Sequence, residues 1–160
     1  MVVRDAGIGD AADIRVVAAS AWRATYSGLL SDRAIEAFVD FAYSIDRLHR
    51  RIERHTFLVA EQAGSIIAFA DAHVEGDRLN LAAMYANPER RQEGAGTLLL
   101  TELRSRFPDR PIEADVLVGN RRGEVFYERR GFVPREEIES DLFGGPVIER
   151  RWWLAARLDG

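Results

Sequence analysis

The residues best suited to chemistry are an arginine and two glycines at the start of an expected helix, in the segment Arg91–Thr97. Gly94 and Gly96 allow the backbone to approach a ligand closely. The first amides of a helix have no intrahelical partner, and the positive end of the helix dipole lies beside them. Together with the charge of Arg91, such amides bind phosphate or pyrophosphate. The segment therefore predicts a site for a phosphorylated cofactor.

The composition of the chain excludes several kinds of catalytic site and binding partner. Its 160 residues, 47% hydrophobic and 30% charged, suit one globular domain that buries a substantial core. All 22 basic residues are arginine and there is no cysteine, which excludes a Schiff-base lysine, a Walker-type phosphate lysine and a thiol nucleophile. A net charge of −4 argues against nucleic acid and for a cationic partner.

No feature of the sequence suggests a membrane or a metal. No apolar run approaches the length needed to cross a bilayer, and Met1–Ala6 is too short and too soon charged for a secretion signal. His49 and His55 have no third partner at metal-ligand spacing and are expected on solvated helix faces. We therefore expect a cytoplasmic protein without membrane contact or bound metal.

Helix and strand patterns alternate along the chain without a linker or repeat. A strand and three helices are followed by three strands, a helix, a strand, a helix and two strands, which predicts an α+β or mixed α/β fold. Asp10 and Ser31 are expected to cap the first two helices. The expected helices are 11–24, the one after Ser31, 44–53, the one after Gly96 and 120–130; the expected strands are 2–4, 56–61, 65–74, 79–86, 112–118, 132–140 and 147–158.

Apolar spacing predicts which side chains of these helices face the core. Gly131 is expected to end helix 120–130 in the left-handed conformation, and the last two strands are expected to flank a turn at 143–146. The inward residues are expected to be Ile45, Leu48 and Ile52 in the third helix, and Leu98, Leu99, Leu103 and Phe107 in the helix after Gly96.

Two segments together resemble the acetyl-CoA signature of the GNAT family of N-acetyltransferases. In that family a strand leads to x-Pro-x-x-Arg/Gln-x-x-Gly-x-Gly/Ala, and a segment Asn-x-x-Ala-x-x-Phe-Tyr-x-x-x-Gly-Phe follows. Gly123 and Gln92 depart mildly from this pattern. The likeness extends more loosely over the whole chain, so residues 1–160 are expected to form a single GNAT domain. The matching residues are Met84-Tyr85-Ala86-Asn87-Pro88, Arg91-Gln92-Glu93-Gly94-Ala95-Gly96 and Asn120…Phe126-Tyr127…Gly131-Phe132.

The resemblance implies a mixed, mainly antiparallel seven-stranded sheet flanked by helices, in which strands 79–86 and 112–118 splay apart. The pantetheine arm of acetyl-CoA, the expected co-substrate, would lie in the gap and pair with the backbone like an added strand. A backbone N–H near Tyr85 or Ala86 would point at the thioester oxygen. The residues implied in cofactor binding are Met84, Tyr85, Ala86, Arg91, Gln92, Glu93, Gly94, Ala95, Gly96, Thr97 and Asn120.

The resemblance also implies acetyl transfer to a primary amine of a small molecule or peptide, by direct attack of the amine on the thioester. Tyr127 is the expected general acid, because a neutral hydroxyl can protonate the departing sulfur and tyrosine stays neutral at physiological pH. Because Tyr127 follows Phe126, it could instead be an aromatic residue of the hydrophobic core. Asn120 is expected to cap the helix and to hydrogen-bond the cofactor.

The general base stays open. Many family members carry a glutamate early in the strand that ends in the signature, but here that position is Asn80, which cannot accept a proton. A water chain could serve instead. The other candidates are Asp71, His73 and Glu75, expected on one face of a strand, and Glu113 and Asp115 on the strand 112–118.

The acceptor and the oligomeric state also stay open. Trp22 and Tyr26 resemble the acceptor-side helix of small-molecule members, yet their spacing of four residues suits helix packing equally well. They favour a small cationic or partly aromatic acceptor among aminoglycosides, polyamines, amino acids and peptide termini. An exposed ring of Trp152 or Trp153 could mark a homodimer contact.

Two other functions compete with the enzyme. A dinucleotide-binding oxidoreductase is disfavoured, because the third glycine of that fingerprint is replaced by Leu99. A non-catalytic acyl-CoA sensor of the same fold is the other alternative, because Asn80 stands where a catalytic glutamate is common in the family. Tyr127 argues against the sensor, since a binding module needs no proton donor at the sulfur.

Overall fold

The computed structural model describes residues 1–142 and 144–157. Seven strands form one sheet: β1 (Val2–Asp5), β2 (Thr56–Gln62), β3 (Ser65–Glu75), β4 (Arg78–Ala86), β5 (Ile112–Leu117), β6 (Val133–Leu142) and β7 (Gly145–Leu154). Their order is β1-β2-β3-β4-β5-β7-β6. Every neighbouring pair is antiparallel except β4 and β5, which are parallel. The mixed, mainly antiparallel sheet of the prediction is confirmed.

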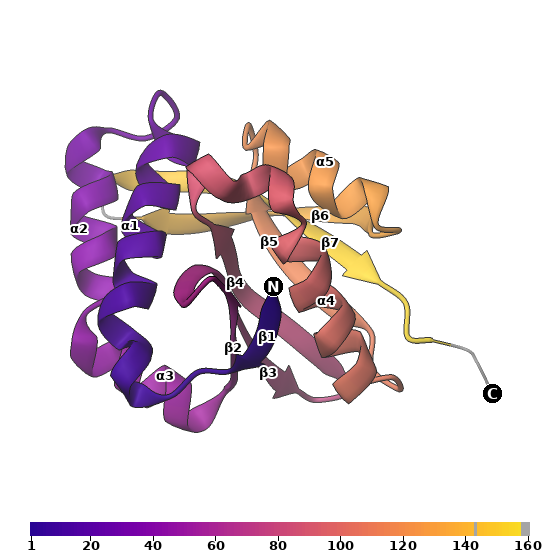
Figure 1. The fold of residues 1–160 in the computed structure, drawn as a ribbon. Coiled ribbons are helices and arrows are strands. Elements are labelled where there is room, and N and C mark those ends of the chain that lie inside the picture. The colour runs from indigo at the N-terminus through magenta and orange to yellow at the C-terminus, as the bar shows by residue number, and fades with distance from the viewer. Residues whose placement is uncertain (143, 158–160) are drawn as a thin grey trace.

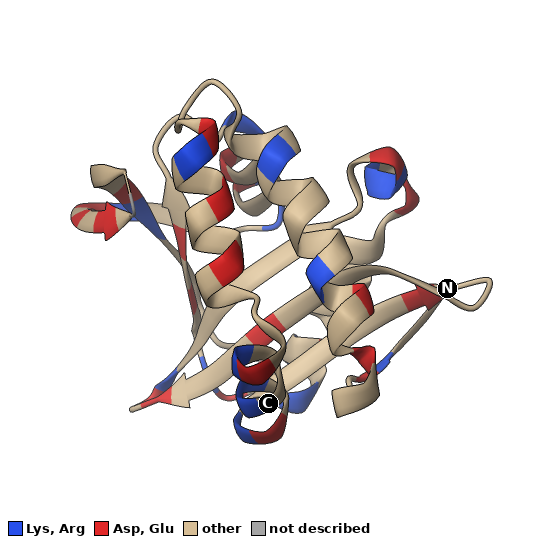
Figure 2. Cartoon of the chain, turned by 90° about the vertical axis from the view of Figure 1, so that its left-hand side faces the viewer, with Lys and Arg blue, Asp and Glu red and all other residues tan. Residues whose placement is uncertain are grey.

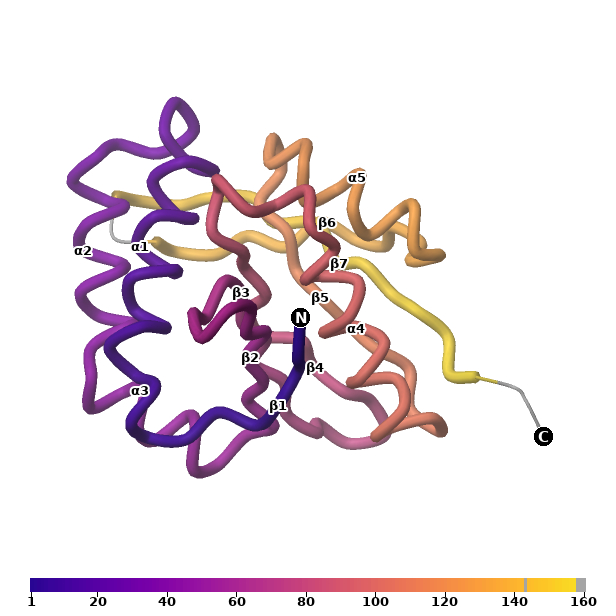
Figure 3. The backbone as a smooth tube through the Cα atoms, viewed as in Figure 1, coloured from indigo at the N-terminus to yellow at the C-terminus, as the bar shows by residue number. Residues whose placement is uncertain are grey.

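Helices cover both faces of this sheet (Figure 1). Helices α1 (Ala11–Tyr26), α2 (Asp32–Ala42) and α3 (Ile45–Arg54) pack on one face around buried Phe57 and Phe69. Helices α4 (Ala95–Arg106) and α5 (Arg121–Arg129) lie on the other side of the molecule, as the tube in Figure 3 also shows. The short 3-10 turns are η1 (Ile8–Asp10) and η2 (Pro88–Glu93). Two hydrophobic clusters result, one on each face of the sheet.

The parallel pair at the centre of the sheet separates soon after it begins. Only Leu79↔Ile112 and Asn80↔Glu113 are paired between β4 and β5. Beyond these positions β4 continues to Ala86 while it remains paired with β3 on its other edge. The expected splay is confirmed. It leaves one backbone edge of β4 without a neighbouring strand, which is the feature that an extended ligand can complete.

The helix N-caps were predicted correctly at Ser31 and Asn120, whose side chains bond a backbone N–H three residues later. The hydroxyl of Ser31 accepts from the Ala34 N–H at 3.1 Å, and the amide oxygen of Asn120 accepts from the Gly123 N–H at 3.1 Å. Asp10 is different: it stands at the N-cap position of α1 but makes no side-chain bond to that helix, because its carboxylate accepts from the Gly7 N–H at the start of η1 and pairs with Arg4, both at 2.8 Å. The expected cap at Asp10 was wrong.

Helix faces were predicted less well than helix positions. Leu98 is 42% exposed and Ile45 is 40% exposed, whereas Leu100, which was not expected inward, is buried. Both exposed residues stand in the first turn of their helices. The expected turn at 143–146 falls partly on residue 143, outside the described ranges, and Gly145 and Pro146 belong to β7. This strand ends at Leu154; residue 158, the expected end, also lies outside the described ranges.

No helix within residues 1–142 and 144–157 combines the length and apolar character needed to cross a membrane. Acidic and basic residues are interspersed along α1 and α2 rather than segregated by sign (Figure 2). A basic face of the kind that binds a nucleic acid backbone is not seen on these two helices.

Candidate active site

A cavity of about 180 Å³ opens where β4 and β5 separate. Pockets that enclose a whole drug-sized ligand measure roughly 300–1,000 Å³, so this one suits the narrow end of a longer molecule. Its wall contains both the predicted acid, Tyr127, and a large part of the predicted cofactor set. The lining residues are Ala21, Thr25, Ala68, Met84, Tyr85, Ala86, Arg91, Gly96, Asn120, Arg122, Gly123, Phe126 and Tyr127.

The turn into α4 has the geometry of an anion site. Gly94 has φ of +82°, a left-handed conformation that disfavours any other residue. The first intrahelical bond of α4 runs from the Leu98 N–H to the Gly94 carbonyl at 3.1 Å, so the amides of Ala95, Gly96 and Thr97 have no partner in the helix. Gln92 and Glu93 belong to η2 instead and do not line the cavity.

A glycine is needed at position 96 for helix packing as well as for the approach of a ligand. A Cβ atom at Gly96 would lie 2.9 Å from Cε2 of the Phe126 ring, closer than carbon atoms tolerate. The glycine therefore lets α4 and α5 pack tightly against each other. At Gly94 a Cβ would meet open space, so its requirement is conformational.

Two arginines without an acidic partner border the cavity. Arg91 donates to the Thr25 hydroxyl at 3.0 Å, and neither Arg91 nor Arg122 forms an ion pair within the described part of the chain. Burial lowers the pKa of Arg91, and the positive charge of Arg122 lowers it further. Two mutually repelling cations beside free helix amides are stabilised by an anion. These residues fit the diphosphate of coenzyme A.

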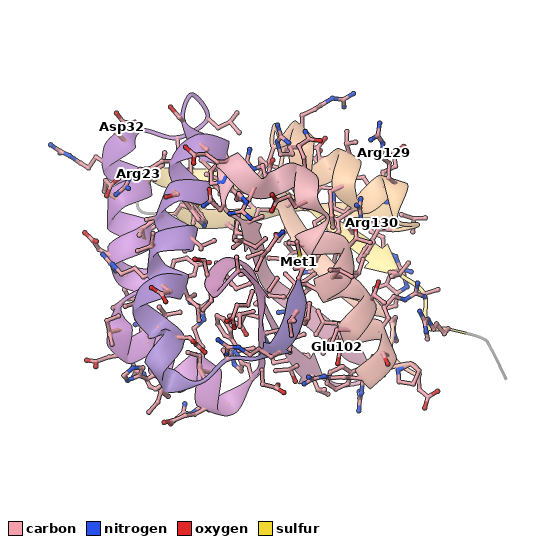
Figure 4. The ribbon with its side chains drawn as sticks, in the orientation of Figure 1. Met1, Arg23, Asp32, Glu102, Arg129 and Arg130 are labelled. Carbon is pink, nitrogen blue, oxygen red and sulfur yellow. The ribbon has the colours of Figure 1, made fainter. Side chains whose placement is uncertain are left out.

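Arg130 adds a third positive charge close to the α4 entrance. It donates to the Thr97 hydroxyl at 2.6 Å and its guanidinium lies 3.6 Å from the centre of the Phe126 ring. Figure 4 places Arg129 and Arg130 together at the C-terminal end of α5, away from Arg23 and Asp32 on the opposite side of the molecule. Thr97 is thus already occupied by a side chain, which leaves its backbone amide as its contribution to anion binding.

Tyr127 is both a core aromatic and a cavity wall, so the two expectations are compatible. Only 8% of the residue is exposed, and its ring packs edge-on against Phe126 and Phe132 at 5.3 and 4.8 Å. Burial raises the pKa of its hydroxyl, which keeps it protonated. The hydroxyl has no hydrogen bond to any described residue, so it is free to donate to a ligand in the cavity.

Asn120 and Gly123 shape the wall next to Tyr127. A Cβ at Gly123 would lie 2.8 Å from the Asn120 side-chain nitrogen. The glycine that departs from the family pattern is therefore required by the capping geometry of this chain.

Trp22 and Tyr26 lie behind the cavity wall rather than in it. Both are 5% exposed, and Trp22 stacks on Phe38 with ring centres 4.1 Å apart. The hydroxyl of Tyr26 is 2.9 Å from that of Tyr85, which lines the cavity. The predicted pair therefore reaches the site through Tyr85.

The candidate general bases do not line the cavity. Asp71 is 1% exposed and pairs with Arg51 at 2.8 Å and His55 at 2.7 Å, so His55 is not the solvated residue expected. The side chain of Glu113 pairs with Arg78 and Arg151. The register of β3 shifts between Asp71 and Ala72, which interrupts the simple alternation expected there. No group of three or more His, Asp or Glu side chains in the described ranges is arranged to hold a metal ion.

Several cavity residues were not predicted. Ala21 and Thr25 come from α1, and nothing in their local sequence marks them. Arg122 did carry a signal: an arginine in the first turn of a helix opposes the helix dipole unless an anion is bound nearby.

Comparison with known proteins agrees with this geometry. Residues 53–134, more than half of the chain, match the family described as "Acetyltransferase (GNAT) domain". The protein named spermidine N(1)-acetyltransferase from Thermoplasma acidophilum is 27% identical over 159 residues, covering 94% of this chain and 96% of that protein.

Solved structures show the same fold. The PaiA N-acetyltransferase of Thermoplasma acidophilum, crystallised with coenzyme A, has a TM-score of 0.81 at 25% identity, over 93% of this chain and 96% of that one. A GCN5-related N-acetyltransferase from Rhodopseudomonas palustris has a TM-score of 0.83 at 18% identity, over 96% and 94% of the two chains. The chain belongs to the GNAT family of acetyltransferases. It is an N-acetyltransferase that uses acetyl-CoA as the acetyl donor.

Proposed function

We propose that the acetyl group is transferred to a primary amine of a small polycation, with spermidine as the first candidate. The observation that carries this proposal is the similarity over 94% of the chain to the protein named spermidine N(1)-acetyltransferase. The net charge of −4 is compatible with a cationic acceptor. In this proposal the whole chain acts as one acetyltransferase domain.

We further propose how the donor is held. The free amides of Ala95–Thr97 and the charges of Arg91 and Arg122 bind the diphosphate, and the open edge of β4 at Met84–Ala86 pairs with the pantetheine arm. Acetyl-CoA supplies a thioester carbon for direct attack by the amine. One backbone donor aimed at the thioester oxygen contributes roughly 3 kcal/mol of transition-state stabilisation.

Tyr127 acts as the general acid in this proposal. Its neutral hydroxyl, buried and without a partner among the described residues, donates a proton to the sulfur that leaves. The chain contains no cysteine, so an acyl-cysteine intermediate does not arise.

The test is thiol release from acetyl-CoA with a panel of amines, followed by mass spectrometry of the products. Spermidine, spermine, putrescine, an aminoglycoside and a peptide with a free N-terminus are compared at equal concentration. We expect a mass increase of one acetyl group on spermidine or a related polyamine, with the highest kcat/KM in the panel. A preference for the peptide or the aminoglycoside would refute the proposal that the acceptor is a polyamine. Tight acetyl-CoA binding without turnover would favour a non-catalytic acyl-CoA sensor.

We also propose that the protein forms a homodimer. Trp152 is buried, and the half-buried ring of Trp153 is covered by Arg135 at 4.1 Å, so neither ring is a bare apolar contact. Light scattering during size-exclusion chromatography, with and without coenzyme A, decides between 18.0 kDa and twice that mass.

A further inference from the structure

One half-buried carboxylate, that of Glu149, has no partner among the described residues. Glu149 of β7 stands opposite Leu117 of β5, and residues directly opposite each other in an antiparallel pair share a face of the sheet. Leu117 and Val147, which is two residues from Glu149, both pack in the cluster that contains Tyr26. Within the described ranges, the Glu149 side chain forms no ion pair and no hydrogen bond. It is half-buried, so it is also open to water.

A pair of tyrosines leads from the cavity toward this carboxylate. Tyr85 lines the cavity, and its hydroxyl is 2.9 Å from that of Tyr26. Tyr26 is 5% exposed, and burial raises its pKa to about 12, with the negative charge of Glu149 acting in the same direction. Burial likewise raises the pKa of Tyr85. At neutral pH neither hydroxyl can keep the negative charge left by proton loss, but a pair of neutral hydroxyls can pass a proton onward.

The other carboxylates on this face are engaged. Asp71 is held by Arg51 and His55, and Glu113 and Asp115 are held by Arg151. If one of them accepted a proton, it would give up an ion pair with an arginine. Asn80 has no proton-accepting carboxylate at all.

We propose that Tyr85 and Tyr26 relay the proton of the attacking amine to Glu149. This step rests on the proposed acetylation of an amine. As the nitrogen–carbon bond forms, the nitrogen gives its proton to the Tyr85 oxygen, the Tyr85 proton passes to the Tyr26 oxygen, and the Tyr26 proton passes to Glu149, directly or through water. Both tyrosines end neutral, and Glu149, now protonated, releases the proton to solvent. The proton taken up by the leaving sulfur comes separately from Tyr127, which regains a proton from solvent before the next turnover.

Steady-state kinetics of Glu149→Gln test the relay, because glutamine keeps the size of the side chain but accepts no proton. We expect kcat to fall about 10²-fold with the KM for the amine unchanged, and Glu149→Asp to recover much of the loss. Glu139→Gln is the matched control: Glu139 is exposed, and its partner across the hairpin is Ile148, on the opposite face of β7. We expect this control to retain full kcat.

A double variant tests whether the two groups act in series. Tyr26→Phe should lower kcat about as much as Glu149→Gln, and the combined variant should be no slower than either single variant, since residues of one pathway are not additive. Calorimetric affinity for coenzyme A and the melting temperature, both independent of turnover, should match the unmodified protein in each variant.

Three outcomes would overturn the relay. The first is an unchanged kcat in Glu149→Gln. The second is a raised KM for polyamines with kcat unchanged, which would make Glu149 an anchor for a second ammonium group. The third is multiplication of the two single effects in the double variant. Failure of the unmodified protein to acetylate any amine would instead refute the proposed function, and the relay with it.

Discussion

At the scale of single residues, the site places one uncharged proton donor beside a cluster of positive charge. Tyr127 lies in the cavity wall, whereas Arg91 and Arg122 border the same cavity without acidic partners in the described ranges. The hydroxyl has to stay protonated to donate, and burial ensures this by raising its pKa. The arginines have to stay charged to bind phosphate. One cavity thus brings together the side chains that we propose for acid catalysis and for anion binding.

Tyr127→Phe tests the acid. The ring still packs against Phe126 and Phe132, so the fold should persist, but no proton reaches the sulfur. We expect turnover to fall by about 10²-fold or more while the affinity for coenzyme A stays similar. Thiol-release kinetics and calorimetry measure the two quantities. Turnover equal to that of the unmodified protein would remove Tyr127 from this role.

Arg122→Gln tests the anion site. Loss of one charge-assisted contact should weaken coenzyme A binding about 10-fold, corresponding to roughly 1.4 kcal/mol. Binding of pantetheine, which lacks the phosphates, should not change. Arg121→Gln is the control, because Arg121 is exposed and does not line the cavity. Equal weakening by both variants would point to general electrostatics instead of a contact.

At the scale of elements, the turn from η2 into α4 determines where the free amides lie. Gly94 supplies the left-handed residue that ends η2 and starts α4, and Gly96 allows α4 to pack on Phe126. The separation of β4 from β5 supplies the open strand edge beside them. Loop, helix and splayed strand therefore act together, and a shift of any one would misplace the others.

Gly94→Ala tests the turn against Gly76→Ala. Both glycines have positive φ, +82° and +61°, and a Cβ at either meets open space, so both variants should lose about 1–2 kcal/mol of stability from backbone strain. Only Gly94→Ala should weaken coenzyme A binding, because Gly76 lies in the β3–β4 turn. Unfolding in urea and calorimetry measure these effects. Unchanged coenzyme A affinity in Gly94→Ala would show that the turn does not hold the diphosphate.

At the scale of the whole molecule, all four tyrosines share one property: their pKa values are raised, chiefly by burial. There is no lysine or cysteine, so tyrosines dominate the titration of the unfolded chain between about pH 9.5 and 12. Above pH 10 the unfolded chain loses tyrosine protons that the folded chain retains. The stability that comes from keeping these groups neutral is fully present below the unfolded pKa and is lost as the pH rises above it.

Alkaline unfolding should accordingly be steep. With up to four protons released on unfolding, the free energy of unfolding should fall by as much as about 5 kcal/mol per pH unit above roughly pH 10. Urea unfolding between pH 8 and 11.5 measures the slope, with tyrosinate absorbance as a second readout. A stability that is flat across this range would contradict the burial of these hydroxyls.

The sequence by itself determined the features that depend on neighbours along the chain. The glycines at 94 and 131 adopt the left-handed conformation, and Ser31 and Asn120 cap their helices, because these preferences act within one turn of backbone. The two signature segments contain much of the cavity wall for the same reason: unpaired helix amides, a glycine turn and a tyrosine stand at fixed spacing within them.

Only the tertiary structure decided which distant side chains meet. The hydroxyl of Tyr26 lies 2.9 Å from that of Tyr85, although the two residues are 59 positions apart in the sequence. Asp71, a candidate base in the sequence, is paired with Arg51 and His55 instead. Leu98 is 42% exposed while its neighbours Ala95 and Leu99 are buried, and helical periodicity alone does not reveal which side of an apolar run faces the sheet. Such contacts depend on how whole elements pack, and packing is set by shape and burial over the entire molecule rather than by local spacing.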